Sequence, residues 1–561
     1  VLRGINWREV FPFTHIFRAF RIAVHPSKLV LGLVALLVLY AGGRVMDAVW
    51  LNKHLAMPRE AQAYEAHRAS NSQRPFGEEL TDARRGAEKM YASKLLQLQV
   101  LTDPKVADEA AATFDRQSEV RGKIMFARDD AVAKAEKAKT DAYAAADKLT
   151  DAKAKDDAKR AADEAFIAAR QSADETAFGT LRKMKLSVPH GIFEELFDYQ
   201  VGQINGIARS IAANAWLAAP AAEPAAAGAR EGAAARLPAP QGVVPHLTNV
   251  LLVGPTWLFK AHWVYGTLFT ILFLAVWAVF GGAISRIAAV QVARDEKISV
   301  RQALRFSINK VLSFAFAPLI PLAIVLVIGL IVAAGGLLFY IPWVGPILGG
   351  ALLFLALIAG VVATLVLFGT VGGFNLMFPT IAVEGSDSFD AISRSFSYVF
   401  ARPWRMAFYT AVALVYFALT YIFVRFFVWV VLAITHGFTT WFLGGQAGYY
   451  FEWMWPAPES IWVLPYDINF PGLKFSEDAG AFLMAFWNYM FIGLVGAFAI
   501  SFYLSVNTII YALMRREVDA TELDDVFVEE TEDDLMEPAA APATVPPLSP
   551  APAPAAAAPS F

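Results

Sequence analysis

The residues best suited to chemistry in this chain are one arginine in an apolar run and a group of aromatic and acidic side chains. Arg425 stands within YIFVRFFVWVV, where an unpaired charge is costly in lipid. It could line a polar cavity or bind an anion, or it could snorkel to the nearer surface or bond a neighbouring carbonyl. Trp453 and Trp455 lie beside Glu452 in a later segment. Aromatic faces next to a carboxylate could hold a sugar or a cationic ligand, and anchoring at the membrane interface also explains these rings.

Motifs for catalysis, cofactors and metals are absent from the sequence. No two of the eight histidines form a pair at metal-ligand spacing. There is no phosphate-binding Gly-rich loop with Lys-Ser/Thr, no Gly-x-Ser-x-Gly elbow and no Gly-x-Gly-x-x-Gly motif after a strand. Because the chain has no cysteine, disulfides and thiolate chemistry are excluded. We therefore assign no catalytic, cofactor-binding or metal-binding residue and expect no nucleic-acid partner.

Six apolar stretches are long enough to cross a bilayer, whose hydrocarbon core of about 30 Å needs about 20 helical residues. They lie at residues 29–51, 261–285, 311–340, 345–374, 405–434 and 482–514. The chain is 57% hydrophobic, and its charged residues concentrate outside these stretches. The sequence therefore predicts an all-α fold, a polytopic helical membrane bundle of about six spans in contact with the lipid bilayer, with an inserted Ala-rich extracytoplasmic helical domain or hairpin.

Lys and Arg residues gather on one side of these spans. The segments on that side are 1–28, 286–310, 375–405 and 515–516. They hold sixteen Lys and Arg residues, whereas the short opposite loops hold only Lys474. Because basic residues near span ends resist translocation, we expect both termini in the cytoplasm and the chain in the cytoplasmic (inner) membrane.

The first span is the weakest of the six predictions. Arg44 and Asp47 follow its apolar core three residues apart, so they could pair near the outer interface. A cleaved signal peptide is the rival interpretation. The small residues at 61–63 lie too far past the apolar run for ordinary cleavage, which favours an uncleaved anchor.

The segment that follows this span is polar, rich in Ala and helix-prone. Asp103 before Pro104 predicts a helix start with Asp as its cap. Beyond it, Ala alternates with charged residues without a sustained Leu or Ile heptad seam, so a strong coiled coil is not expected. The pattern fits one long helix or a hairpin that turns near 149–158. Such an element is either a solvated spacer or a partner-binding stalk.

Residues 187–217 become amphipathic, with one apolar stripe. A helix of this kind suits packing on the bundle or lying in the outer interface. An extracytoplasmic protein or envelope layer could therefore bind through residues 104–217. A linker rich in Pro, Ala and Gly follows at 219–245.

The third and fourth spans contain residues that interrupt helices or allow them to pack closely. Pro318 and Pro321 predict a kink or break near the start of the third span. The fourth span is rich in Gly, which allows close packing or, in broken helices, builds transporter sites.

Three approaches to spans, at 16–31, 298–318 and 387–407, place Arg and Phe on short amphipathic runs. We expect interfacial elbow helices there and a weak internal repeat of an elbow-plus-span unit.

Part of the last approach, at 379–405, carries a recognisable pattern. Its members are Pro379, Val383, Glu384, Gly385, Ala391, Arg394 and Ser395. The segment resembles one shared by uncharacterised bacterial multipass membrane proteins, including the membrane domain found beside some glycerophosphodiester phosphodiesterases. The resemblance implies a helical membrane fold. Since no phosphodiesterase catalytic domain is attached, no activity is carried over from those proteins. The speculative functional residues are then Arg425, Glu384, Arg394, Trp453, Trp455 and Glu452.

The predicted organisation has six parts. They are a cytoplasmic amphipathic N-terminus at 1–28, a first transmembrane helix at 29–51, an extracytoplasmic helical domain at 52–218, a linker at 219–245, a five-span membrane domain at 246–516 and a disordered cytoplasmic tail at 517–561. The five-span domain includes elbow helices at 298–310 and 387–403 and an aromatic outer loop at 435–481. The tail holds eleven Asp or Glu residues between 517 and 537 and then becomes rich in Pro and Ala, so it cannot bury enough apolar surface to order itself.

These features favour a structural or interaction role, in which a membrane anchor presents a helical stalk outside the cytoplasm. A transporter or channel-like protein that uses the kinked and Gly-rich spans with Arg425 is the alternative. A membrane-embedded enzyme ranks third. The pattern specifies no oligomeric state.

Overall fold

The computed structural model describes residues 11–51, 54–70, 73–185, 187–217, 241–458, 460–464 and 475–527. Over these ranges the chain is all-α, with isolated bridges and no β-strand. Six helices are long and apolar enough to cross a membrane, which confirms the prediction of a multi-pass helical protein. They are Pro26–Val49, Trp263–Arg294, Leu319–Tyr340, Val344–Glu384, Pro403–Thr440 and Ser476–Asp519.

The spans form three consecutive units, each with a short helical approach, an outgoing helix and a returning helix. The first unit comprises η1 (Pro12–Phe17), α2 (Arg18–Ala23), α3 (Pro26–Val49), α12 (Trp263–Val276), η5 (Trp277–Gly281) and α13 (Gly282–Arg294). The second comprises α14 (Val300–Asn309), α15 (Val311–Phe316), α16 (Leu319–Gly336), η6 (Leu337–Tyr340) and α17 (Val344–Glu384). The third comprises α18 (Ser388–Ala401), α19 (Pro403–Thr440), α20 (Gly445–Met454) and α21 (Phe475–Asp519). Short helices therefore occupy all three predicted approaches.

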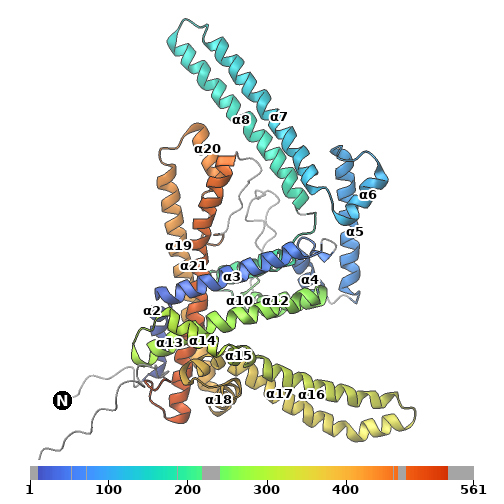
Figure 1. Ribbon diagram of the computed structural model, residues 1–561, viewed down its shortest axis with the longest axis vertical. Helices are drawn as coiled ribbons and strands as arrows, with labels where there is room; N and C mark the ends of the chain where they lie inside the picture. Colours follow the sequence, from blue (N-terminus) through green and yellow to red (C-terminus); the bar gives the residue numbers. More distant parts are fainter. Residues whose placement is uncertain are drawn as a thin grey trace, which may run out of the picture.

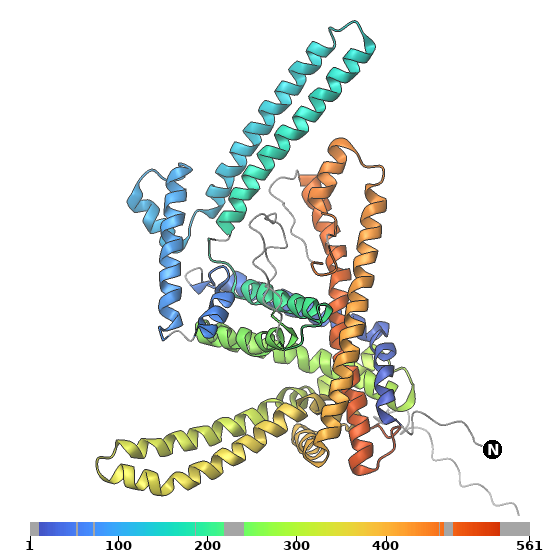
Figure 2. The same ribbon diagram turned by 180° about the vertical axis from the view of Figure 1, so that it is seen from behind.

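The returning helices α13, α17 and α21 pack against one another where the units begin. Together with α2, α14, α15 and α18, which pack around them, they form what we call the hub. Three helix pairs diverge from the hub, α3 with α12, α16 with α17 and α19 with α21 (Figure 1, Figure 2). The most apolar parts of α16 and α17 bury no residue within the protein. Their side chains are thus left for the bilayer to cover.

The long insertion lies between α3 and α12. Its helices are α4 (Glu60–Ala69), α5 (Phe76–Gln97), α6 (Pro104–Thr113), α7 (Gln117–Ala146), α8 (Ala152–Lys185), α9 (Ile192–Ala212), α10 (Val243–Thr248), η4 (Asn249–Val253) and α11 (Gly254–Ala261). Helices α7 and α8 form a long antiparallel hairpin, which we call the stalk (Figure 1). The hairpin alternative is therefore the correct one. Most of the predicted linker, and the predicted tail beyond residue 527, lie outside the described residues.

Two local predictions about helix ends are confirmed. The Asp103 carboxylate accepts a hydrogen bond from the backbone N–H of Lys105 at 2.9 Å, which caps α6 as expected. The third span is interrupted before Pro318, where α15 ends and α16 begins. The missing N–H of proline and its clash with the preceding turn account for this break.

A π-helical turn in the second span was not predicted. At the end of the η5 turn the backbone N–H of Gly282 is shared between the carbonyl oxygens of Ala278 and Val279. The Ser307 hydroxyl lies 2.8 Å from the carbonyl oxygen of Ala278 and 2.7 Å from that of Val279. A Cβ at Gly282 would stand 2.3 Å from the Ser307 oxygen, so glycine is required for this close approach. The contact joins α14 to the middle of the returning helix.

Candidate functional site

One face of α19 holds the segment that follows α20. Arg425, Trp429 and His436 follow one another at intervals of four and seven residues, which places them on the same side of an α-helix. The Trp429 indole N–H donates to the carbonyl oxygen of Pro458 at 3.2 Å. His436 donates through Nε2 to the carbonyl oxygen of Trp455 at 3.1 Å. We call these three donors the α19 clamp.

Arg425 is the most heavily bonded member of the clamp and is only 3% exposed. Its guanidinium donates to the carbonyl oxygens of Ile461 and Trp462, the latter at 2.9 Å. It also donates to Asn205 Oδ1 on α9 at 2.6 Å and to the Tyr421 hydroxyl at 3.3 Å. Every partner is neutral. This arrangement matches the predicted alternative in which Arg425 bonds neighbouring carbonyls, since each of its nitrogens has an acceptor.

The base of the stalk rests on α20, directly beside the clamp. The Arg170 guanidinium lies 4.3 Å from the centre of the Tyr450 ring. Two turns farther along α8, the Phe178 and Trp453 rings have centroids 4.8 Å apart. Both α8 residues are buried, each with an exposed fraction of 6%. We call this pair of contacts the stalk seat.

An ion cluster braces the two stalk helices behind the stalk seat. Asp174, on the turn between the two seat residues of α8, is 2% exposed. Its carboxylate lies 2.7 Å from Nε of Arg128 on α7 and 3.7 Å from Nε of Arg170. Arg170 thus links the interior of the stalk to α20, because its guanidinium lies near both Asp174 and the Tyr450 ring.

The predicted aromatic and acidic group is therefore divided between different roles. Trp453 packs on the stalk, and Trp455 is 7% exposed in a core cluster with Phe451. Glu452 is half-exposed, lies 3.3 Å from His436 Nε2 and accepts from the backbone N–H of Ala457. The rings are used in packing within the protein, a role that neither predicted explanation, a ligand site or anchoring at the membrane interface, had included.

The charged pair at the end of α3 does not interact as expected. Asp47 accepts from the backbone N–H groups of Phe193 and Glu194, at 2.9 and 3.2 Å, and from the Tyr265 hydroxyl at 2.8 Å. Arg44 pairs instead with the Glu194 carboxylate at 2.8 Å. The free N–H groups and positive dipole at the start of α9 attract Asp47. Sequence spacing within α3 cannot show this competing partner.

Glu384 and Arg394, the charged residues of the resemblance segment, meet at the hub. Arg394 Nε lies 2.8 Å from one oxygen of Glu384. The other oxygen accepts from the Tyr511 hydroxyl at 2.5 Å and lies 3.3 Å from Arg515 Nε. Arg515 also pairs with Asp525 at 2.7 Å. We call this group the hub network, and it joins the ends of α17, α18 and α21.

A second acid extends the hub network. The Tyr398 hydroxyl donates to Asp519 at 2.5 Å. Burial of the ring, followed by this hydrogen bond, raises the pKa of Tyr398 well above its ordinary value. Asp390, one turn before Arg394 on α18, lies 3.3 Å from its Nε. Cations and carboxylates are thus interleaved across the hub.

The chain after α21 folds back over the hub as a strap, residues 520–527. The Phe527 backbone N–H donates to the carbonyl oxygen of Val383 at 2.8 Å. Arg286 on α13 donates to the carbonyl oxygens of Ala382 and Phe527 at 2.8 and 2.7 Å. These bonds hold the first part of the predicted solvated tail in place. They depend on pairings across distant segments, which composition does not reveal.

Sequence reasoning missed the most deeply buried cation of the hub. Lys28 is 0% exposed, and its Nζ donates to Gln291 Oε1 at 2.7 Å and Ser505 Oγ at 3.4 Å. In the sequence it is one of the basic residues that flank the first span. Ser505 within the last predicted span, and Gln291 just past the predicted end of the second, were the available signal.

Among the residues that the structure describes, no cluster of three or more His, Cys, Asp or Glu side chains could hold a metal ion. The arrangement instead supports mechanical coupling at the clamp and charge pairing at the hub. No protein-family model matches the chain, and neither a curated protein nor a solved structure is significantly similar to it. The resemblance of residues 379–405 to bacterial multipass membrane proteins therefore stays a prediction.

Proposed function

We propose that this multi-pass protein anchors the stalk in the cytoplasmic membrane and presents it to a protein or envelope layer outside the cytoplasm. The observation that carries the proposal is the stalk seat, where α8 packs on α20. The α19 clamp in turn ties the segment after α20 to a span. A stalk held at its base keeps a defined direction relative to the spans, as a presenting arm requires.

The free part of the stalk supports a soluble partner rather than lipid. Beyond the seat, α7 and α8 pack mainly against each other and carry exposed ion pairs such as Lys155 with Asp147. One large apolar side chain remains exposed there, Leu149 at 46%. A charged surface with few exposed apolar side chains is typical of a solvated face, and charged groups of this kind are costly to place in lipid.

The proposed orientation places the hub in the cytoplasm and the stalk outside. An even number of spans and the presence of both His15 and Arg516 at the hub support ends on one side. The basic residues of the approaches support the cytoplasm as that side. Because the chain has no cysteine, single cysteines at Val300 and Ser460 can be labelled in intact cells. An impermeant thiol reagent should label only position 460, and equal labelling of both positions would contradict the orientation.

A shortened stalk tests the proposed presentation. Deleting 133–146 and 152–165 removes about four turns from each helix, which preserves the packing face and shortens the stalk by about 21 Å. The deletion retains the turn and the stalk seat. A photo-crosslinking residue at Leu149 therefore remains at the tip in both proteins.

The intact stalk should give a discrete crosslinked product from position 149, and the shortened stalk should lose it because its tip no longer reaches the partner. A probe at Phe442, which is 95% exposed on the loop after α19, is the matched control and should be unaffected. Equal products from the intact and shortened stalks would reject presentation at a defined distance.

Solute transport is the second candidate, and Lys28 is the observation that favours it. An ionisable group buried on a span with only neutral acceptors described around it is a recurrent feature of transport pathways. In proteoliposomes, transport predicts a solute flux that survives stalk shortening and is lost in Lys28→Met. The anchor proposal predicts no flux above that of empty liposomes.

A further inference from the structure

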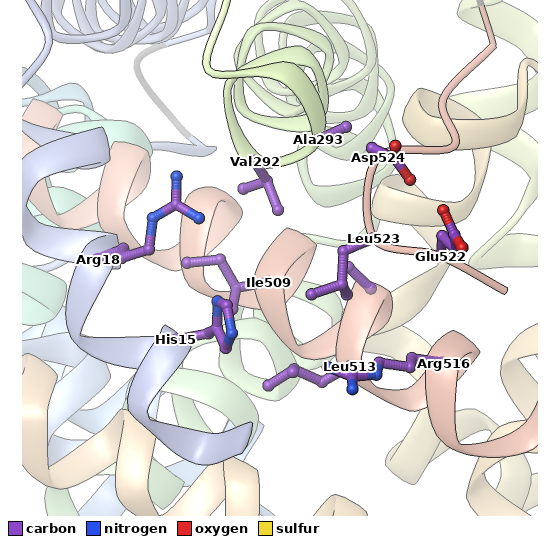
Figure 3. Close-up of a pocket in the computed structure, with 11 residues that line it drawn as sticks. His15, Arg18, Val292, Ala293, Ile509, Leu513, Arg516, Glu522, Leu523 and Asp524 are labelled. Carbon is purple, nitrogen blue, oxygen red and sulfur yellow. The ribbon is translucent and has the colours of Figure 1, made fainter. Parts of the chain in front are cut away.

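A pocket of about 430 Å³ opens at the hub beneath the strap. Its walls come from η1, α2, α13, α21 and the strap (Figure 3). His15 and Arg18 lie on one side of the pocket, and Glu522 and Asp524 project from the strap on the opposite side (Figure 3). We call this cavity the hub pocket. Its volume lies within the range of small-ligand sites, about 300–1,000 Å³.

Charges of both signs line the hub pocket without neutralising one another. Arg516, Glu522 and Asp524 make no ion pair with any described residue. Arg18 has one long contact, 3.5 Å from its terminal nitrogen to Asp295. The neighbouring hub network behaves differently, because its carboxylates contact arginines directly. The hub pocket therefore offers cationic and anionic groups to a ligand that carries the complementary pair.

The floor of the hub pocket is apolar. Ile509 and Leu513 on α21 are 3% and 1% exposed, and Val292 on α13 completes this surface. These residues lie near the ends of two spans, α13 and α21. These spans are 32 and 44 residues long, and about 20 residues cross the hydrocarbon core, so their ends extend to the lipid headgroups or past them. The site thus combines a charged rim with an apolar floor on the side of the membrane where these ends emerge.

We propose that the hub pocket binds a phosphoethanolamine group. Its phosphate would contact Arg18 and Arg516, and its primary ammonium would donate to Glu522 and Asp524. The apolar floor receives the glycerol and upper acyl carbons of a phospholipid. The same chemistry is carried by phosphatidylethanolamine in the membrane and by soluble glycerophosphoethanolamine.

The two acids distinguish this ligand from other phospholipids. A phosphatidylglycerol headgroup has no cation and would face the negative charges of Glu522 and Asp524 directly. A phosphatidylcholine headgroup has a cation without N–H donors, so it cannot form charge-assisted hydrogen bonds to the carboxylates. Both should bind less tightly than phosphatidylethanolamine.

The test is lipid binding to the full chain, measured by native mass spectrometry with phosphatidylethanolamine, phosphatidylcholine and phosphatidylglycerol of identical acyl chains. The wild-type protein should favour phosphatidylethanolamine over phosphatidylglycerol by about tenfold, the equivalent of one charge-assisted hydrogen bond. The double variant Glu522→Gln/Asp524→Asn should bring this ratio close to one. Arg516→Gln should weaken binding of all three lipids by a similar factor.

Matched controls separate binding at the hub pocket from general surface charge. Arg21 shares the Asp295 partner of Arg18 but does not line the pocket, so Arg21→Gln controls for Arg18→Gln. Exposed Glu296 is the control for the acids. An unchanged lipid ratio in the double variant, or equal weakening by Arg18→Gln and Arg21→Gln, would overturn the proposal. Both acids are exposed, so their substitution leaves the folded core intact.

Competition with soluble glycerophosphoethanolamine identifies the source of the ligand. If the membrane lipid is the ligand, millimolar glycerophosphoethanolamine should leave the lipid adduct in place, because it gains nothing from the apolar floor. If the soluble compound is the ligand, it should displace the adduct and bind in the absence of lipid. Binding of neither compound would contradict the assignment.

Discussion

The α19 clamp and the hub network both depend on arginine, but they balance its charge differently. Arg425 has only neutral oxygen partners, three of them from a loop and from α9. In the hub network, Arg394 and Arg515 share the carboxylate of Glu384. The clamp uses a cation to hold backbone carbonyls, and the hub uses an anion to hold cations. Removing one group therefore leaves unsatisfied dipoles in the first region and takes the shared buried anion from two cations in the second.

Glu384→Gln should have the largest effect, because it leaves two arginines without a shared counter-charge in a site where the glutamate side chain is only 9% exposed. Breaking a buried pair costs about 3–5 kcal/mol of unfolding free energy, and we expect about 3 kcal/mol here because Arg394 is 40% exposed and both arginines keep a second carboxylate. Thermal unfolding in lipid nanodiscs measures the loss. The matched control is Asp390→Asn, whose partner is also Arg394 but whose side chain is 45% exposed. It should cost about 1 kcal/mol or less, and equal effects of the two variants would contradict the described burial.

Arg425→Met should rank second, at about 2–3 kcal/mol, because it leaves buried carbonyl oxygens without donors. The effect should be local, with faster proteolysis of 455–464 than of the hub. Arg425→Lys keeps the charge but lacks the planar fork, so it should restore only part of the stability. A fully stable Arg425→Met protein would show that the clamp does not hold the loop.

A pH series tests an ion pair at the start of α9, the helix that also carries Asn205, a partner of Arg425 in the clamp. Burial disfavours the charged form of His190, but the hydrogen bond and charge of Glu195, 3.1 Å away, outweigh it and raise the pKa of this histidine. The pair therefore stabilises the fold fully below pH 6.5, and this contribution is lost as the pH rises through the raised value. The difference in Tm between wild type and His190→Gln should be largest at pH 5.5 and smallest at pH 9. A difference that grows with pH would contradict the assignment.

Glu452→Gln should have the smallest effect of the set. Its carboxylate is 48% exposed where it approaches His436, and exposed pairs of this kind contribute about 0–1 kcal/mol. The clamp bond from His436 to Trp455 does not need the acid. A loss as large as that of Arg425→Met, measured in the same unfolding assay, would place Glu452 inside the clamp rather than at its edge.

The elements of this fold that depend on local sequence could be predicted. Continuous apolar length predicts the six spans, Pro318 predicts the break between α15 and α16, and Asp103 predicts the start of α6. Contacts between distant segments could not be predicted from the sequence. The capture of Asp47 by α9 is one example, and the burial of Lys28 against α13 and α21 is another. Both depend on how the units pack, which hydropathy does not encode.

The same distinction applies to the candidate site. Arg425 could be identified from the sequence, because the cost of a charge in an apolar run can be judged from the neighbouring residues alone. Trp429 and His436, the other two members of the clamp, are ordinary residues for a span near the interface, so the sequence did not identify them as functional. The stalk seat also joins residues far apart in the chain, Arg170 with Tyr450 and Phe178 with Trp453. Only the folded arrangement brings them together.

The most direct test of the account measures the direction of the stalk relative to the spans. Spin labels on cysteines at Leu149 and Phe442 report the distance between the stalk tip and the loop after α19 by double electron–electron resonance, without background from native cysteine. A fixed stalk predicts a narrow distance distribution that broadens when Tyr450 and Trp453 are both replaced by Ala. A distribution that is broad in the wild-type protein and unchanged in this variant would show that the stalk is not held at its base.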